Sequence, residues 1–215
     1  RPPCFGVWPA SPWVLMSVRV LDERLKRIQL WALVAFAVVL PLGQAPPAIA
    51  LGVGLVALIA RMLVERHRPM LAPSPLNPLL VAWFVVALLS FQNSVDWWAS
   101  FKGLQKLLKY GALYVWVIDT LRSRESLRGL LIGCLVGLSI VAADGLWQAA
   151  FGRDVFYGRL PMIWGSVRRV TATYHHANDL AIYLTSLIPL ALAVAQTRAG
   201  RVRWLALAAC VAGMA

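Results

Sequence analysis

Charge is scarce in this sequence, and acidic charge most of all. Only 14% of the 215 residues are charged, and Asp and Glu together number 9. A soluble domain is about a quarter charged and about half apolar, whereas this chain is 60% hydrophobic and has a mean hydropathy of +0.69. The composition therefore excludes a soluble enzyme and predicts a membrane protein.

Cysteine is sparse too, and its spacing excludes two further classes. Cys4, Cys134 and Cys210 stand far apart, so they form neither a zinc-ligand pattern nor a disulfide framework. The acidic residues expected outside the membrane are also scattered: Asp96, Asp154 and Asp179. We therefore expect no metal and no cofactor.

Basic residues are numerous, with 21 Lys and Arg giving a net charge of +12. Such a balance often indicates a nucleic-acid partner. Here, however, the basic residues lie between long apolar runs, where they act as topology signals. We therefore expect no nucleic-acid partner.

The apolar runs predict an all-α, polytopic membrane helix bundle. Residues 28–60 carry no charge and are too many for one helix across a core of ~30 Å, and Pro46 and Pro47 break the run. We expect six complete spans and a truncated seventh, at about 28–43, 47–64, 76–92, 104–121, 129–150, 177–197 and 204–215.

Both ends of the sequence suggest a fragment. Residues 1–15 are rich in Pro and Trp without periodicity, and Met16 then begins a basic lead, so we interpret 1–15 as a non-native or disordered leader. The last apolar run is shorter than the ~20 residues that a span needs. Residues 16–215 would then be the amino-terminal part of a single transmembrane domain.

Basic segments also predict the orientation. Four of them, at 19–27, 61–68, 122–128 and 198–203, fall on one side of the expected bundle. The positive-inside rule makes that side cytoplasmic, so the amino terminus is expected in the cytoplasm.

Seven basic residues fall on the opposite, outer side, against that rule: Lys102, Lys106, Lys109, Arg153, Arg159, Arg168 and Arg169. The three lysines are spaced i, i+4, i+7 and share one helix face. Ammonium and guanidinium groups both pair well with phosphate oxygens. The pattern therefore favours a bound lipid phosphate or diphosphate.

The outer segment 151–178 ends in a motif that runs from Arg169 to Asn178 and continues as Asp-Leu-Ala into the sixth span. It resembles the R-x-x-G-x-F-x-[NH]-P-N-x-x-A stretch of the O-antigen ligase/polymerase family, which also opens a transmembrane helix after an outer loop. The matching positions are Arg169, Tyr174, His176, Asn178 and Ala181. Two positions depart: Ala172 replaces Gly, which removes freedom at positive φ, and Ala177 replaces Pro, which leaves the helix entry less fixed.

The resemblance implies a GT-C-like, metal-independent, inverting transferase in the bacterial inner membrane. Such a protein passes a glycan from undecaprenyl diphosphate to an acceptor: lipid A–core, a growing glycan or a protein. These three acceptors stay open, and membrane lipids are the remaining expected partners. A histidine in a later outer loop is the family's base and would lie beyond Ala215, so we expect this chain to bind its carrier without turnover.

The resemblance makes Arg169 a contact of the diphosphate. The other candidate binding residues are Arg168, Arg159, Lys102, Lys106, Lys109, His176 and Asn178. Asn178 or Asp179 could instead cap the sixth helix. Asp144, inside the fifth span, is a functional hypothesis because a carboxylate there is costly, but it could also face water or pair with a loop arginine.

A multi-pass transporter of anions or small solutes is the alternative. A transporter should show intramembrane ionisable residues or helices broken at corresponding positions of two halves. The sequence shows one acidic residue inside a span and no internal repeat, so the transferase is favoured.

Overall fold

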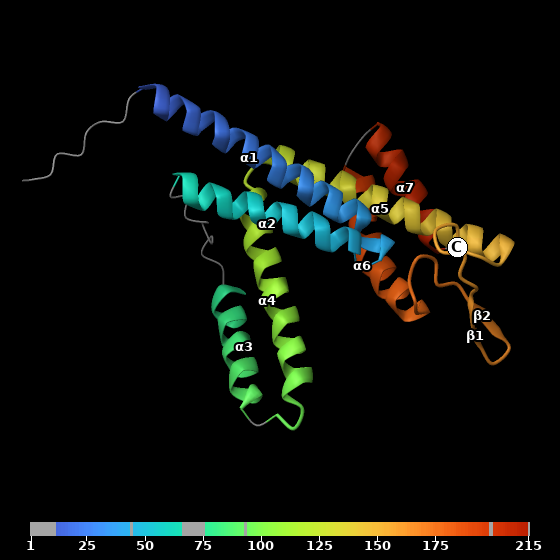
Figure 1. Ribbon diagram of the computed structural model, residues 1–215. Coiled ribbons are helices and arrows are strands. Elements are labelled where there is room, and N and C mark those ends of the chain that lie inside the picture. Colours follow the sequence, from blue (N-terminus) through green and yellow to red (C-terminus); the bar gives the residue numbers. More distant parts are fainter. Residues whose placement is uncertain (1–11, 44, 66–75, 93, 198–199, 215) are drawn as a thin grey trace, which may run out of the picture. The chain divides into compact units, whose positions relative to one another are not determined.

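The computed structural model describes residues 12–43, 45–65, 76–92, 94–197 and 200–214, and most of them are helical (Figure 1). The helices are α1 (Pro12–Val39), α2 (Ala45–Glu65), α3 (Leu76–Phe91), α4 (Trp97–Thr120), α5 (Arg124–Phe151), α6 (Ala177–Thr197) and α7 (Arg201–Met214). A 3-10 turn, η1 (Leu40–Leu42), follows α1, and a hairpin of β1 (Met162–Trp164) and β2 (Val167–Arg169) precedes α6.

Four segments are long and apolar enough to cross a membrane: Val18–Leu42, Ala45–Val64, Arg124–Phe151 and Ala177–Thr197. Helix α3 and the segment Val202–Val211 are apolar but shorter. The chain is therefore a membrane protein built mainly of helices. Residues 1–11 of the expected leader lie outside the described part, and α1 begins at Pro12.

The chain divides into two compact units, and each is described by itself. The first contains residues 1–29 and 53–120, and the second contains residues 30–52 and 121–215. Helices α1 and α2 contribute one part to each unit.

The second unit is built on close contact between α5 and the end of α1. Gly133 and Gly137 lie one turn apart on α5, and a Cβ on them would lie 3.0 Å from the Val34 carbonyl oxygen and 2.8 Å from that of Ala37. Small residues spaced by four allow two helices to approach in this way inside a membrane. The core of the unit, which includes Leu138, then packs α5 against α6 and α7.

The first unit contains a buried charge cluster that sequence reasoning did not predict. The Arg61 guanidinium donates to Asp22 Oδ1 at 2.7 Å, to Gln29 Oε1 at 2.7 Å and to Asp119 Oδ2 at 2.8 Å. Lys26 Nζ lies 2.5 Å from Asp22 Oδ2. The sequence interpretation counted Arg61 among the basic residues that follow the second span, whereas its side chain is buried and links α2 to α1 and α4.

Helices α3 and α4 form the rest of this unit as an antiparallel hairpin (Figure 1). Asp96 Oδ1 accepts the Ala99 N–H at 3.0 Å, so a side-chain cap starts α4 at Trp97, seven residues before the expected span. Helix α3 has no fully buried residue; the face with Leu80 and Phe84 is half-buried, and most of its other apolar side chains are exposed. That surface suits lipid rather than water.

Candidate functional site

The candidate site is the loop between α5 and α6, residues 152–176 of the second unit. Its central support is Gln148, a fully buried residue one turn before the point where α5 ends at a left-handed Gly152. Gln148 Oε1 accepts the N–H groups of Thr171 at 2.7 Å and Ala172 at 2.9 Å, while its Nε2 donates to the Arg159 carbonyl at 3.1 Å and to Thr171 Oγ1 at 3.2 Å. The Gln148 side chain therefore joins the segments before and after the β-hairpin to α5.

Two buried aspartates hold the first half of the loop. Asp154 accepts the N–H of Tyr157 at 2.5 Å and that of Arg159 at 2.8 Å, and Asp144 Oδ1 accepts the Val155 N–H at 2.8 Å. The second oxygen of Asp144 is buried without a hydrogen-bond partner among the described residues. Asp144 thus binds the loop backbone; it is buried, and it pairs with no arginine among the described residues.

The Arg159 guanidinium contacts other residues of the loop. Its Nη1 donates to the Thr173 carbonyl at 2.8 Å, its Nη2 lies 3.3 Å from His175 Nε2, and its guanidinium stacks 4.2 Å from the Tyr157 ring centroid. The Tyr157 hydroxyl in turn donates to the Leu42 carbonyl at the end of η1. Arg159, one of the predicted binding residues, therefore has a structural role within the loop.

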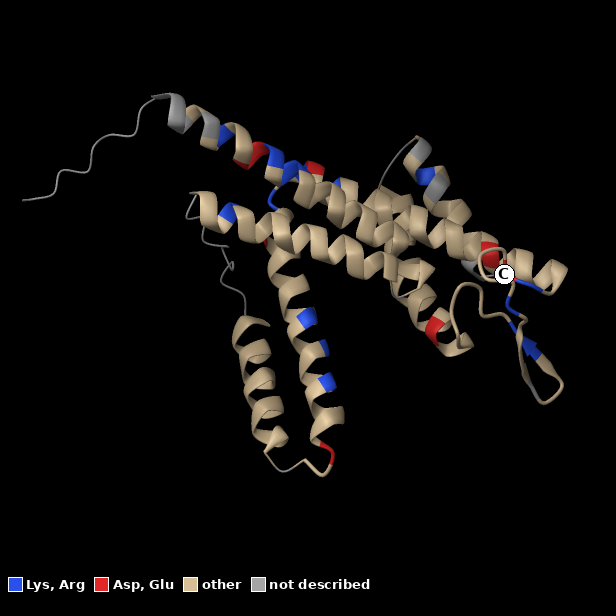
Figure 2. Cartoon of the chain, in the orientation of Figure 1, with Lys and Arg blue, Asp and Glu red and all other residues tan. Residues whose placement is uncertain are grey.

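Arg168 and Arg169 lie on the hairpin, where Ile163 pairs with Arg168 and Met162 pairs with Arg169. Both arginine side chains are exposed, and Figure 2 shows basic residues on the loop and on β2. Because adjacent residues of a strand point to opposite faces, these two cannot present a joint face, so substituting one provides a control for the other.

The motif before α6 is mostly buried backbone with exposed polar side chains. Thr171, Ala172 and Thr173 are at most 3% exposed, and Ala172 has a φ of 48°, which makes it the one described residue other than glycine with positive φ. Burial, and to a lesser extent the Asp179 carboxylate, raises the pKa of Tyr174, so its phenol stays protonated at neutral pH.

His176 and Asn178 are exposed at the entrance of α6. The helix begins at Ala177, so Asn178 and Asp179 lie within its first turn rather than before it. The His176 carbonyl accepts the N–H groups of Asp179 and Leu180, at 3.1 and 3.4 Å. A side-chain cap by Asn178 or Asp179 is not among the hydrogen bonds of the described residues.

The remaining predicted binding residues, Lys102, Lys106 and Lys109, lie in the first unit on α4 and are exposed on one face (Figure 2). Arg159, Arg168, Arg169 and His176 thus lie in one loop, and Asn178 lies in the first turn of the helix that follows it. Among the described residues, no three His, Cys, Asp or Glu side chains are placed to hold a metal ion.

Sequence reasoning missed Gln148, Asp154 and the two threonines of the motif. Gln148 follows Asp144 by four residues, so two polar groups share one face of an otherwise apolar helix. That spacing could have indicated a buried polar contact at Gln148.

Comparison of the chain with protein-family models, with curated proteins and with solved structures gives no match.

Proposed function

We propose that this chain belongs to a glycan transferase that takes its glycan from undecaprenyl diphosphate at the outer face of the bacterial inner membrane. The observation that carries the proposal is the backbone of Ala172. Its positive φ lies at the position where the O-antigen ligase/polymerase pattern has glycine, the residue that adopts such a φ without strain. The departure from the pattern therefore falls at a position where the residue of the pattern would suit the observed backbone.

The chemistry of the loop suits a lipid diphosphate. A diphosphate is already a good leaving group, so a transferase needs mainly to neutralise the charge that develops on it. The loop has four arginines and one aspartate, and that aspartate is buried with its carboxylate bound to backbone N–H groups. Arg169 is the proposed diphosphate contact, with His176 and Asn178 at the adjacent helix entrance.

The proposal includes a GT-C-like bundle in which α3, α4 and α7 also enter the membrane. The charge cluster of the first unit supports alternating helix directions, because Arg61 joins the beginning of α1 to the ends of α2 and α4. Those are the ends that the basic segments assign to the cytoplasm. The acceptor stays open between lipid A–core, a glycan and a protein.

The test is binding of undecaprenyl diphosphate to the purified chain in an uncharged detergent, measured by native mass spectrometry. Arg169→Ala should weaken binding about ten- to a hundredfold, since one charge-assisted hydrogen bond contributes roughly 1.5–3 kcal/mol. Arg169→Lys should not restore binding because it lacks the forked pair of donors. Arg168→Ala is the control. Unchanged affinity in Arg169→Ala would remove Arg169 from the site.

A transporter is the second candidate, and one observation favours it. Arg61, Asp22 and Asp119 are ionisable residues buried between helices, which is a common mark of transport pathways. The guanidinium, however, already binds three acceptors, so the cluster leaves no open site for a solute. If anion uptake into liposomes is lost in Arg61→Leu and kept in Arg169→Ala, the transporter is favoured.

A further inference from the structure

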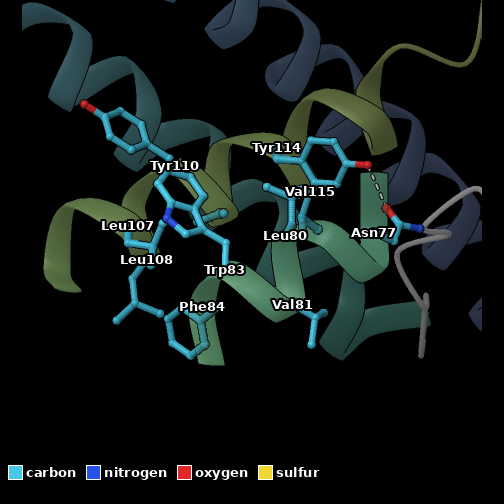
Figure 3. A pocket seen from close by; sticks show the side chains of 12 residues that line it. Asn77, Leu80, Val81, Trp83, Phe84, Leu107, Leu108, Tyr110, Tyr114 and Val115 are labelled. Atoms are coloured by element: carbon cyan, nitrogen blue, oxygen red, sulfur yellow. Dashed lines mark hydrogen bonds between the residues drawn. The ribbon is translucent and has the colours of Figure 1, made fainter. Parts of the chain in front are cut away.

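Two apolar surfaces of the described chain are not used by the proposed function. The first is a groove of about 490 Å³ between α3 and α4, with Leu80, Trp83 and Leu107 among its walls (Figure 3). A hydrogen bond from the Tyr114 hydroxyl to Asn77 Oδ1, at 2.7 Å, crosses between these helices. None of the described residues that line the groove is charged, so its walls would accept any apolar chain and identify no partner.

The second surface is the loop after α5, which combines apolar with basic side chains. Arg153 and Arg168 are exposed on this loop. The exposed apolar side chains are those of Phe151, Val155, Phe156, Leu160, Ile163 and Val167. Apolar area together with basic charge is what binds a protein segment to the surface of an anionic membrane.

The β1–β2 hairpin exposes an apolar and a basic residue on each of its two faces. Ile163 pairs with Arg168 across the strands, so these two side chains share one face. Val167 and Arg169 are two residues apart on β2, so they share the other face. Ile163 is 72% exposed and Val167 is 57% exposed. A docked protein would cover one face of the hairpin, whereas the headgroup layer of a bilayer surrounds both.

The length of α5 places this loop at the level of the lipid headgroups. The helix has 28 residues, which span about 42 Å and match the ~40–45 Å of a bilayer with its headgroup regions. Trp147 and Phe151, exposed in its last turns with ring centroids 4.1 Å apart, form an aromatic pair of the kind found at membrane interfaces. Figure 1 shows the hairpin at the level where α5 ends.

Two further contacts fix the position and the charge of the loop. The Tyr157 hydroxyl donates to the Leu42 carbonyl, at the end of the first membrane-crossing segment. Asp154 is the single acidic residue of the loop 152–176, and its carboxylate accepts the N–H groups of Tyr157 and Arg159. The charge that the loop exposes is therefore basic, and it complements lipid phosphates.

We propose that the β1–β2 hairpin lies in the headgroup layer of the bilayer and binds anionic phospholipids. Ile163 and Val167 contact the lipid carbons next to the headgroups, and the guanidinium groups of Arg153 and Arg168 bind the phosphates. This inference goes beyond the proposed function, because its partner is the lipid surface and not the glycan carrier.

The first test measures depth with a spin label on the full chain in phosphatidylglycerol nanodiscs. The label is attached to Ile163→Cys or to Val167→Cys in a chain whose three native cysteines are replaced by alanine. At both positions, oxygen, which concentrates in lipid, should relax the label more than a water-soluble nickel complex does. Ile182→Cys, at a residue that is 65% exposed on the membrane-crossing α6, provides the reference for lipid contact.

The second test measures amide hydrogen exchange of hairpin peptides in nanodiscs. Protection should be about thirtyfold higher in phosphatidylglycerol than in phosphatidylcholine, equivalent to about 2 kcal/mol, because each basic residue near an anionic surface contributes about 1 kcal/mol. Arg153→Gln/Arg168→Gln should abolish this difference, and Arg153→Lys/Arg168→Lys should keep most of it. The control is Arg124→Gln/Arg128→Gln, which removes two exposed charges near the other end of α5 and should keep the difference.

Three results would each overturn the proposal. A stronger effect of nickel at both labels would place the hairpin in water. A stronger effect of nickel at one label only would assign the other face to a protein partner, such as a second copy of the chain. Equal protection of the hairpin in the two lipids would remove the role of the arginines. Neither test uses undecaprenyl diphosphate, so the glycan transferase and this inference can fail separately.

Discussion

Gln148→Leu should open the candidate site without unfolding the chain. Leucine is close to glutamine in size, so the substitution leaves little cavity while it removes all four hydrogen bonds of the side chain. The Arg159 carbonyl keeps the Asp154 N–H as a donor at 3.0 Å. The N–H groups of Thr171 and Ala172 lose their acceptor in a place where both residues are buried.

The magnitude follows from those two N–H groups. Each buried N–H left without an acceptor costs roughly 1–3 kcal/mol, so the pair costs about 4 kcal/mol. That free energy corresponds to about a thousandfold change in the equilibrium for local opening. Helices α5 and α6 keep their own hydrogen bonds, so the loss should be confined to the loop.

Amide hydrogen exchange read by mass spectrometry is the appropriate assay. Peptides that contain Thr171 and Ala172 should lose protection by up to a thousandfold in Gln148→Leu, while peptides from the middle of α5 should not change. Gln105→Leu makes the same substitution at an exposed position of α4 and should have no effect. Wild-type protection at 171–172 in Gln148→Leu would refute the argument that this amide supports the motif.

Three further predictions concern thermal unfolding of the purified chain in detergent. A Cβ at Gly54 would overlap the buried indole ring of Trp116, so Gly54→Ala should lower the free energy of unfolding by about 3 kcal/mol. Gly52 has open space around it, so Gly52→Ala should be neutral or slightly stabilising. Arg61→Leu should cost about 3–5 kcal/mol because it leaves buried carboxylates without their ion-pair partner. The double variant Arg61→Leu/Asp119→Leu should recover at least half of that loss, and additive losses would contradict this prediction. At the positive φ of Ala172, Ala172→Val should cost more than about 3 kcal/mol, while Ala172→Gly should stay within about 1 kcal/mol, because relief of strain offsets the lost methyl group.

The apolar runs, and the charged and proline residues that interrupt them, were sufficient to predict a membrane protein made of helices. The run 177–197 coincides with α6, because it begins after a polar loop and ends at a basic segment. The start of α4 was placed too late because the lysines of its first half interrupt the apolar run. The helix instead begins where the Asp96 carboxylate caps it, a signal that hydropathy does not contain.

The buried polar contacts could not be predicted from local sequence. Arg61 looks like a loop residue because it ends a charge-free run, and its partners Asp22 and Asp119 are 39 and 58 residues away in the chain. The support of the motif is similar, since Gln148 meets Thr171 only once the loop has folded back on α5. Hydrophobic patterning specifies which helices form, but pairing of polar groups across such distances depends on the packed structure.

The buried polar groups have different partners in the two units, and the difference bears on function. In the first, the Arg61 guanidinium is bound by carboxylates and an amide oxygen, so a ligand could enter only by displacing one of them. In the second, Gln148 and the aspartates bind backbone N–H groups, which fixes the loop while Arg168 and Arg169 stay exposed. A cation that binds an external anion must keep donors available for it. The arginines of the loop are exposed to such an anion, whereas Arg61 is buried among its acceptors. This difference is the physical reason to look for carrier recognition at the loop and to expect Arg61 variants to change stability before they change binding.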